Sequence, residues 1–210
     1  SAPESTVREL VNELEKHFPD VIPLLPNLIE DWKTHPVSSL VMTKCYPWND
    51  GDRVALMGDS AHAIVPFYGQ GMNSGMEDCT VLDGLLDASD NWDDIMAQYT
   101  ALRKPAGDAI LELALQNYIE MRDLTGDASF LQQKQLESRL QQKHPDRWLP
   151  LYSQVTFSHT PYHEALAKGK HQQRIMERIM ADPQAWNNFS DDSWMEAALD
   201  ALTQHDTAAT

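Results

Sequence analysis

The sequence is poor in cysteine and in basic residues. Only two of its 210 residues are cysteines, Cys45 and Cys79, which are too few for a disulfide scaffold or a cysteine-based zinc site. Lysine and arginine number 16 against 32 aspartates and glutamates, which gives a formal net charge of −16. Because nucleic acids and anionic membranes attract clustered positive charge, we expect no nucleic-acid partner and no membrane surface.

Long apolar runs and a secretory signal are also lacking. A membrane-spanning helix needs about 20 consecutive apolar residues, and no stretch of the sequence approaches that length. The first residues do not show a charged segment followed by an apolar one. We therefore expect a cytoplasmic protein.

Metal-binding spacing is not found in the sequence. His62 has no partner at ligand spacing, so a hydrogen-bonded structural role is the favoured interpretation. The segment DLTGDASF from Asp123 resembles a calcium loop, but its glycine, Gly126, is at the fourth position and the bidentate glutamate is missing. We expect no metal site.

A glycine-rich stretch, GDSAHAIVPFYGQGMNSGMED at residues 58–78, is the most distinctive part of the sequence. The apolar run Val54–Met57 precedes it and predicts a strand buried on both faces of a parallel sheet. Asp59 would then lie at the carboxyl end of that strand, where its carboxylate could accept hydrogen bonds from a sugar-like hydroxyl. Alternatively, Asp59 only caps the following turn.

A helix is expected to begin near Met72 or Asn73, directly after this stretch's Pro66 and its closely spaced glycines. Its apolar side would carry Met76, Cys79, Leu82, Leu85 and Leu86, and its polar side Glu77, Asp78, Asp83 and Asp87. Because the first amides of a helix favour negative charge, the loop and helix together predict an anion or a polarised carbonyl as ligand.

Gly58-Asp59-Ser60 also resembles the nucleophile block of a serine hydrolase. That chemistry requires a separate downstream Asp-x-x-His block, and the only such spacing in the chain is Asp59 to His62 itself. A catalytic triad therefore cannot be assembled from these residues.

Other elements follow from periodicity and from proline. The sequence predicts a helix over Ser5–His17, a strand over Val37–Tyr46, a helix beginning at Pro105, a helix over Tyr162–Ala181 and a short helix over Ser190–Thr203. The basic residues Lys168, Lys170, Arg174 and Arg178 are interpreted as a solvated face.

Asn117 lies on the apolar face of the helix expected from Pro105. A buried amide must find hydrogen-bond partners or cost about 1 to 3 kcal/mol. Taken alone, the pattern favours a structural hydrogen bond to a neighbouring helix. A ligand-binding role is the alternative.

Residues 58–78 resemble the second flavin-binding segment of the class A flavoprotein aromatic hydroxylases, whose pattern is G-D-[AS]-A-H, a proline and then G-x-G-x-N. Within that family, the chain is most similar to members that act on L-kynurenine. The segments that carry this similarity are FPDVIPLL (18–25), VPFYGQGMN (65–73), QNYIEMR (116–122) and LPLYSQVTFSHTPYHEA (149–165). The resemblance extends from about residue 18 to residue 170.

The resemblance implies two sets of binding residues and no catalytic acid or base. FAD would be bound by Asp59, Pro66, Gly71, Met72 and Asn73, and the aromatic substrate by Phe67, Tyr68, Gln70, Asn117 and Tyr152. Tyr68 departs from the phenylalanine or histidine expected at its position.

The implied reaction is hydroxylation of L-kynurenine to 3-hydroxykynurenine in tryptophan degradation. NADPH would reduce FAD, and O2 would then react through a flavin C4a-hydroperoxide. Two alternatives remain: a class A hydroxylase for another aromatic substrate, and a non-catalytic helical module.

The implied fold is α/β with a large α-helical C-terminal part, the C-terminal portion of a PHBH-like hydroxylase. The domain prediction assigns 1–47 to the end of a substrate-binding domain and 48–104 to a piece of the FAD-binding domain. It assigns 105–185 to a helical domain over the substrate pocket and 186–210 to a tail. Because no G-x-G-x-x-G is found, the N-terminal half of the same enzyme is expected as a partner, and this chain alone is expected to be inactive.

Overall fold

The computed structural model describes residues 4–36, 38–182, 191, 193–194, 196–197 and 199–200. It contains two compact units, 1–40 and 41–210. The first unit holds α1 (Glu4–His17), a 3₁₀ turn (Ile22–Leu24) and α2 (Leu28–Thr34). The α1 helix confirms the predicted helix Ser5–His17 to within one residue at its start.

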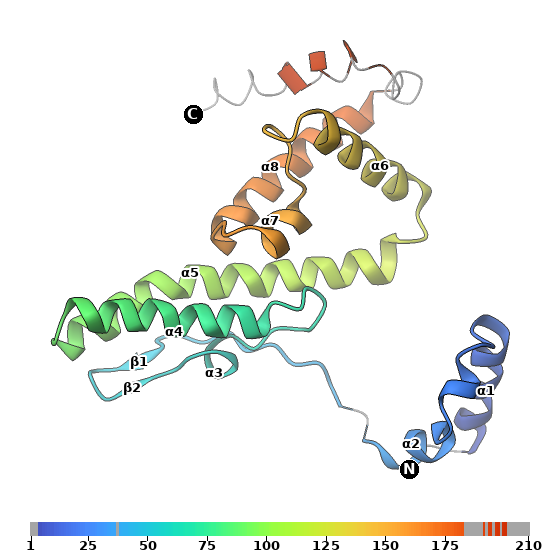
Figure 1. Ribbon diagram of the computed structural model, residues 1–210, viewed down its shortest axis with the longest axis horizontal. Helices are drawn as coiled ribbons and strands as arrows, with labels where there is room; N and C mark the ends of the chain where they lie inside the picture. Colours follow the sequence, from blue (N-terminus) through green and yellow to red (C-terminus); the bar gives the residue numbers. More distant parts are fainter. Residues whose placement is uncertain are drawn as a thin grey trace. The chain divides into compact units, whose positions relative to one another are not determined.

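The second unit is mainly helical (Figure 1). Its elements are β1 (Asn49–Asp50), β2 (Val54–Ala55), α3 (Asp59–His62), α4 (Gly71–Ala88), α5 (Trp92–Ile119), a π-helical turn (Glu120–Leu124), α6 (Ala128–Lys143), α7 (Leu151–Phe157) and α8 (Tyr162–Ala181). The helix-rich part of the predicted fold class is confirmed, and α8 has the predicted bounds. Half of the residues of the helix predicted over 190–203 lie outside the described residues.

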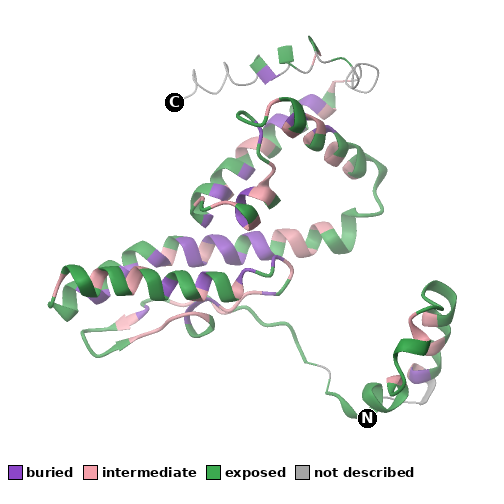
Figure 2. Ribbon diagram, viewed as in Figure 1, coloured by how far each residue is buried: buried purple, intermediate pink, exposed green. Residues whose placement is uncertain are grey.

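The long helix α5 organises this unit. It packs against α3 and α4 and against α8, and its central turns are buried (Figure 2). The prediction that a helix begins at Pro105 is wrong, because Pro105 lies inside α5. Packing on both sides of the helix compensates for the backbone hydrogen bond that proline cannot donate. The expected domain boundary between 104 and 105 thus falls within one continuous helix.

One strand prediction is correct in position only, and the other is wrong. Within the described residues, a strand forms at Val54–Ala55, but it pairs with β1 in antiparallel register and Val54 is 54% exposed, so the predicted burial in a parallel sheet is wrong. Over its described residues, the predicted strand 37–46 has no strand structure. The Thr43 amide donates to the Ala63 carbonyl over 2.9 Å, but one such bond makes no ladder.

Helix α4 begins at Gly71, close to the predicted start, but its faces differ from the prediction. Its fully buried residues are Ser74 and Asp78, whereas Met76 is 64% exposed. Of the other residues expected on the apolar face, Cys79 and Leu86 are exposed, whereas Leu82 and Leu85 pack against the core. Asp78 was expected on the polar face of the helix. It is buried because its carboxylate binds the ionic cluster described below.

Three apolar clusters stabilise the second unit. The first, Trp48, Ala61 and Tyr99, lies between α3, α5 and the segment before β1. The second joins the loop before α4 to α5, α7 and α8. The third joins α6 and α8 around Trp148 and Met176. Within the described part of the chain, no helix is both long enough and apolar enough to cross a bilayer.

Gly107 of α5 is expected to be intolerant of any side chain. A Cβ there would lie 2.7 Å from Trp48 Cη2, and the buried indole is held by a hydrogen bond from Nε1 to the Cys45 carbonyl. Gly107→Ala should therefore destabilise the protein by about 1 to 2 kcal/mol, because overpacking outweighs the gain in helix propensity. Gly84→Ala in α4 meets nothing within 4 Å and should stabilise by about 0.5 to 1 kcal/mol.

Chemical denaturation of both variants measures the two effects. A lower free energy of unfolding for Gly107→Ala and a higher one for Gly84→Ala would support the packing explanation. A stabilising Gly107→Ala would contradict it.

Candidate functional site

The segment 58–73, which runs from the turn before α3 through the α3–α4 loop to the first turn of α4, carries eight of the ten predicted site residues. Two glycines give it its shape: Gly58 and Gly69 have φ values of 55° and 67°, a region that side chains rarely adopt. Gly75 faces the first of these turns, since a Cβ on it would lie 3.6 Å from the Gly58 Cα, so α4 passes close to that turn.

The residues predicted to bind FAD lie at the surface around the start of α4. Asp59, Pro66, Met72 and Asn73 are exposed, and Gly71 is half-buried. The Asp59 carboxylate lies beside the helix start, since its Oδ1 is 4.0 Å from the point where a Cβ on Gly71 would stand. These residues are accessible to a large ligand.

The first turn of α4 retains hydrogen-bonding capacity for such a ligand. The first amides of a helix have no partner within it, and Gln70, at the N-cap, makes no side-chain hydrogen bond to them. An electron-rich ring edge fits these donors, and a hydroxylated chain fits the neighbouring Asp59 carboxylate. The residues present therefore suit a flavin.

A buried ionic cluster fixes the turn that carries Asp59. Asp78 is fully buried and accepts three hydrogen bonds, from the Gly58 amide (2.9 Å), His62 Nε2 (2.6 Å) and Arg103 Nε (2.7 Å). Arg103 also donates to the Ser74 carbonyl over 3.2 Å. The cluster joins α3, α4 and α5 directly beneath the turn.

The cluster keeps Asp78 ionised although it is buried. Burial acts to raise the pKa of Asp78, but the hydrogen bonds from His62, Arg103 and Gly58 outweigh it and hold the pKa below its ordinary value. His62 is thus a hydrogen-bonded residue of the interior, as expected. The described residues contain no group of three or more histidine, cysteine or acidic side chains placed to bind a metal.

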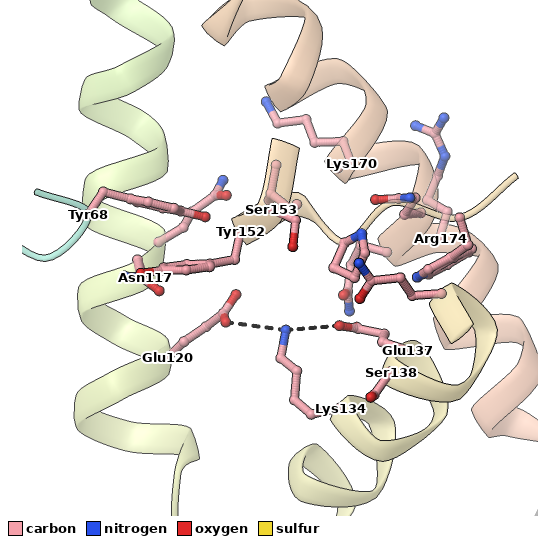
Figure 3. Close-up of a pocket in the computed structure, with 18 of the residues that line it drawn as sticks. Tyr68, Asn117, Glu120, Lys134, Glu137, Ser138, Tyr152, Ser153, Lys170 and Arg174 are labelled. Atoms are coloured by element: carbon pink, nitrogen blue, oxygen red, sulfur yellow. Dashed lines mark hydrogen bonds and ion pairs between the residues drawn. The ribbon is translucent and has the colours of Figure 1, made fainter. Parts of the chain in front are cut away.

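Three of the five residues predicted to bind the substrate line one cavity. Tyr68, Asn117 and Tyr152 form one side of a cavity of about 820 Å³ (Figure 3). Tyr68 and Tyr152 stack with ring centroids 5.5 Å apart. An aromatic stack beside an amide suits a ligand that has both a ring and polar groups.

Phe67 and Gln70 do not line the cavity, although Phe67 contacts Asn117, which does. Asn117 Nδ2 donates to the Phe67 carbonyl over 2.8 Å, so the partner of Asn117 is the loop and no neighbouring helix. Phe67 packs on Tyr118, with ring centroids 4.5 Å apart. Gln70 is buried and accepts a hydrogen bond from Asn73 on its other side.

Charged residues on the opposite side of the cavity were not anticipated. Lys134 of α6 lies 3.5 Å from a Glu120 oxygen and 3.2 Å from a Glu137 oxygen (Figure 3). Lys170 and Arg174 of α8, which were interpreted as a solvated face, also line the cavity. The spacing of Lys170 and Arg174 along α8 could not reveal that they line a cavity, because the residues opposite them come from α6 and the end of α5.

The glycine turn, the open helix start and the neighbouring aromatic cavity could together accommodate a planar cofactor and a small aromatic ligand. Comparison with known families agrees with this class of site. Residues 1–114 match the family described as "FAD binding domain", and the chain belongs to that family.

Several relatives of the chain carry the same name. The chain is 50% identical over 177 residues, 83% of its length, to a protein of Flavobacterium johnsoniae named "Kynurenine 3-monooxygenase". Proteins of the same name from Christiangramia forsetii and Stenotrophomonas maltophilia are 46% identical over 80% of the chain and 42% identical over 89%. The resemblance predicted from the motifs is confirmed. The aligned part is 38 to 40% of each of these relatives, so the chain spans about two fifths of their length.

Proposed function

We propose that the protein is a flavin-dependent monooxygenase that hydroxylates L-kynurenine to 3-hydroxykynurenine with NADPH and O2. The observation that carries the proposal is the convergence of Tyr68, Asn117 and Tyr152 on one cavity. Asn117 and Tyr152 are far from Tyr68 in the sequence, and Tyr68 belongs to the same predicted flavin-binding segment as the exposed residues Asp59 and Asn73.

The flavin-facing residues would bind and orient FAD. The Asp59 carboxylate would accept hydrogen bonds from the ribityl hydroxyls, and Pro66 would lie beside the ring system. The amides of Gly71, Met72 and Asn73 would stabilise negative charge on the ring edge, as the donors of an oxyanion hole do. FAD, when bound, supplies the activation of O2.

The cavity residues would position the substrate. Asn117 uses Nδ2 for the Phe67 carbonyl, which leaves Oδ1 to accept from the substrate's ammonium group. Tyr152 would donate its hydroxyl to the carboxylate and pack against the aromatic part together with Tyr68. The amino group on the substrate ring activates the neighbouring carbon, so the protein needs only to orient the ring and exclude water.

The chain aligns with about two fifths of the relatives' length. The remaining binding groups, including those for the ADP part of FAD, would come from the regions that correspond to the rest of these relatives. This account retains the expected C-terminal portion of a PHBH-like fold. A class A hydroxylase for another aromatic substrate is the alternative: it would use the same flavin loop and would not depend on Asn117 and Tyr152.

Asn117→Ala tests the substrate assignment. Losing one or two hydrogen bonds to the substrate should raise the KM for L-kynurenine about tenfold. FAD content should change less than substrate binding, because Asn117 lines the cavity and contacts the loop only through the Phe67 carbonyl. Steady-state kinetics and flavin absorbance of the full-length protein measure the two quantities, and equal losses of both would count against the role.

A further inference from the structure

Tyr162, the first residue of α8, is attached to the flavin-binding loop. Its side chain is 8% exposed and packs in the cluster that contains Tyr68 and Val155. Its hydroxyl donates to Gln70 Oε1 over 3.1 Å. Burial, followed by the charge of Glu77, raises the pKa of Tyr162 to about 12, so the phenol keeps its proton at neutral pH and remains a donor.

Gln70 is the junction between this tyrosine and the start of α4. It is 5% exposed, and its Oε1 also accepts a hydrogen bond from Asn73 Nδ2 over 2.9 Å. One oxygen atom therefore joins α8 to the first helical turn. That turn holds Gly71, Met72 and Asn73, the residues proposed to face the flavin ring edge.

The same helical region forms a wall of the cavity. Tyr152 of α7 and Lys170 of α8 line it, and α7 packs on α8, where Gly169 leaves room for Leu151. The Tyr162 hydrogen bond is thus a buried polar connection between the elements around the substrate and the residues around the flavin.

We propose that Tyr162 is a positioning residue that, by holding Gln70, fixes the loop 66–73 between the flavin and the substrate. The inference rests on the proposed function. Without the hydroxyl, Gln70 loses a buried partner and the loop gains freedom. Because productive oxygen transfer requires an oriented substrate and a dry site, more of the NADPH oxidised would then yield hydrogen peroxide.

The test compares Tyr162→Phe with Tyr99→Phe in the full-length protein. Tyr99 is the control for loss of a buried hydroxyl: it is fully buried, and its hydroxyl donates to the Leu56 carbonyl over 3.2 Å, outside residues 66–73. Amide hydrogen exchange over 66–73 and the fraction of NADPH oxidation that ends as peroxide are measured for both variants, together with flavin content.

Tyr162→Phe should accelerate exchange over 66–73 and raise the peroxide fraction, each about fivefold, the factor expected for one ordinary hydrogen bond. Tyr99→Phe should change neither quantity. Unchanged exchange in Tyr162→Phe would overturn the attachment, and faster exchange with an unchanged peroxide fraction would overturn the role in the reaction. A wild-type protein that binds no FAD would overturn the proposed function, while the exchange comparison would still decide whether Tyr162 fixes the loop.

Discussion

Replacing Asp78 with alanine is expected to lower the free energy of unfolding by about 3 to 5 kcal/mol, the usual result of removing one partner from a buried ion pair. Three donors lose their acceptor at once: the Gly58 amide, His62 Nε2 and Arg103 Nε. The Gly58 amide belongs to the turn that carries Asp59, and Asp78 ties this turn to His62 and Arg103. The variant should therefore also lose flavin, because the turn is no longer held.

Asp83→Ala is the matched control for this change. Asp83 lies on the same helix and is exposed, so its removal should change stability by less than about 0.5 kcal/mol. Chemical denaturation measures both variants. Similar small losses for Asp78→Ala and Asp83→Ala would show that the buried cluster does not stabilise the fold.

The Asp78 cluster also predicts how stability depends on pH. Because the pKa of Asp78 is lowered in the folded state, its contribution is present above the ordinary value of 3.8 and is lost as the pH falls through the lowered value. The free energy of unfolding of Asp78→Ala should therefore fall less steeply below about pH 4 than that of the wild type.

Asp59→Ala should weaken FAD binding about 10- to 150-fold with little change in stability. A hydrogen bond to a charged group contributes about 1.5 to 3 kcal/mol, which corresponds to that range of dissociation constants. Because Asp59 is exposed, its removal leaves no buried group unpaired. Titration of the apoprotein with FAD, followed by flavin fluorescence, measures the effect.

Asp52→Ala is the control for Asp59→Ala. Asp52 is exposed in the turn between β1 and β2, and its one ion pair, with Arg53, is long at 3.8 Å. FAD binding should be unchanged in this variant. If Asp59→Ala binds FAD as the wild type does, Asp59 has no part in the cofactor site.

Helices were predicted correctly where neighbouring residues alone mark them, through periodicity or through glycine and proline. α1 and α8 follow from their periodicity, and the start of α4 follows from the glycines and the proline before it. A local signal failed at Pro105, because the packing of α4 and α8 around α5 determines whether a helix continues through proline.

Tertiary pairing explains the other errors. The apolar run Val54–Met57 reads as a buried strand, but a strand needs a partner, and the partner found within the described residues is β1. Asp78 reads as a polar-face residue until His62 and Arg103 are placed beside it by α3 and α5. The same limit applies to Lys170 and Arg174, whose cavity is completed by α6.

The candidate site was predictable where a motif marked it. The loop 58–73 and the positions of Asn117 and Tyr152 came from the resemblance, and the structure places Asn117, Tyr152 and Tyr68 around one cavity. Tyr162 lies within a segment that carried the resemblance, but its role depends on a hydrogen bond to a residue 92 positions away. No local pattern records a contact at that separation.

The most direct test of the proposed function is NADPH oxidation by the full-length protein with and without L-kynurenine, with the product identified by mass. The account predicts that kynurenine stimulates the oxidation and is recovered with one added oxygen. A flavin-bound protein whose NADPH oxidation does not respond to kynurenine, and which leaves kynurenine unchanged, would contradict it.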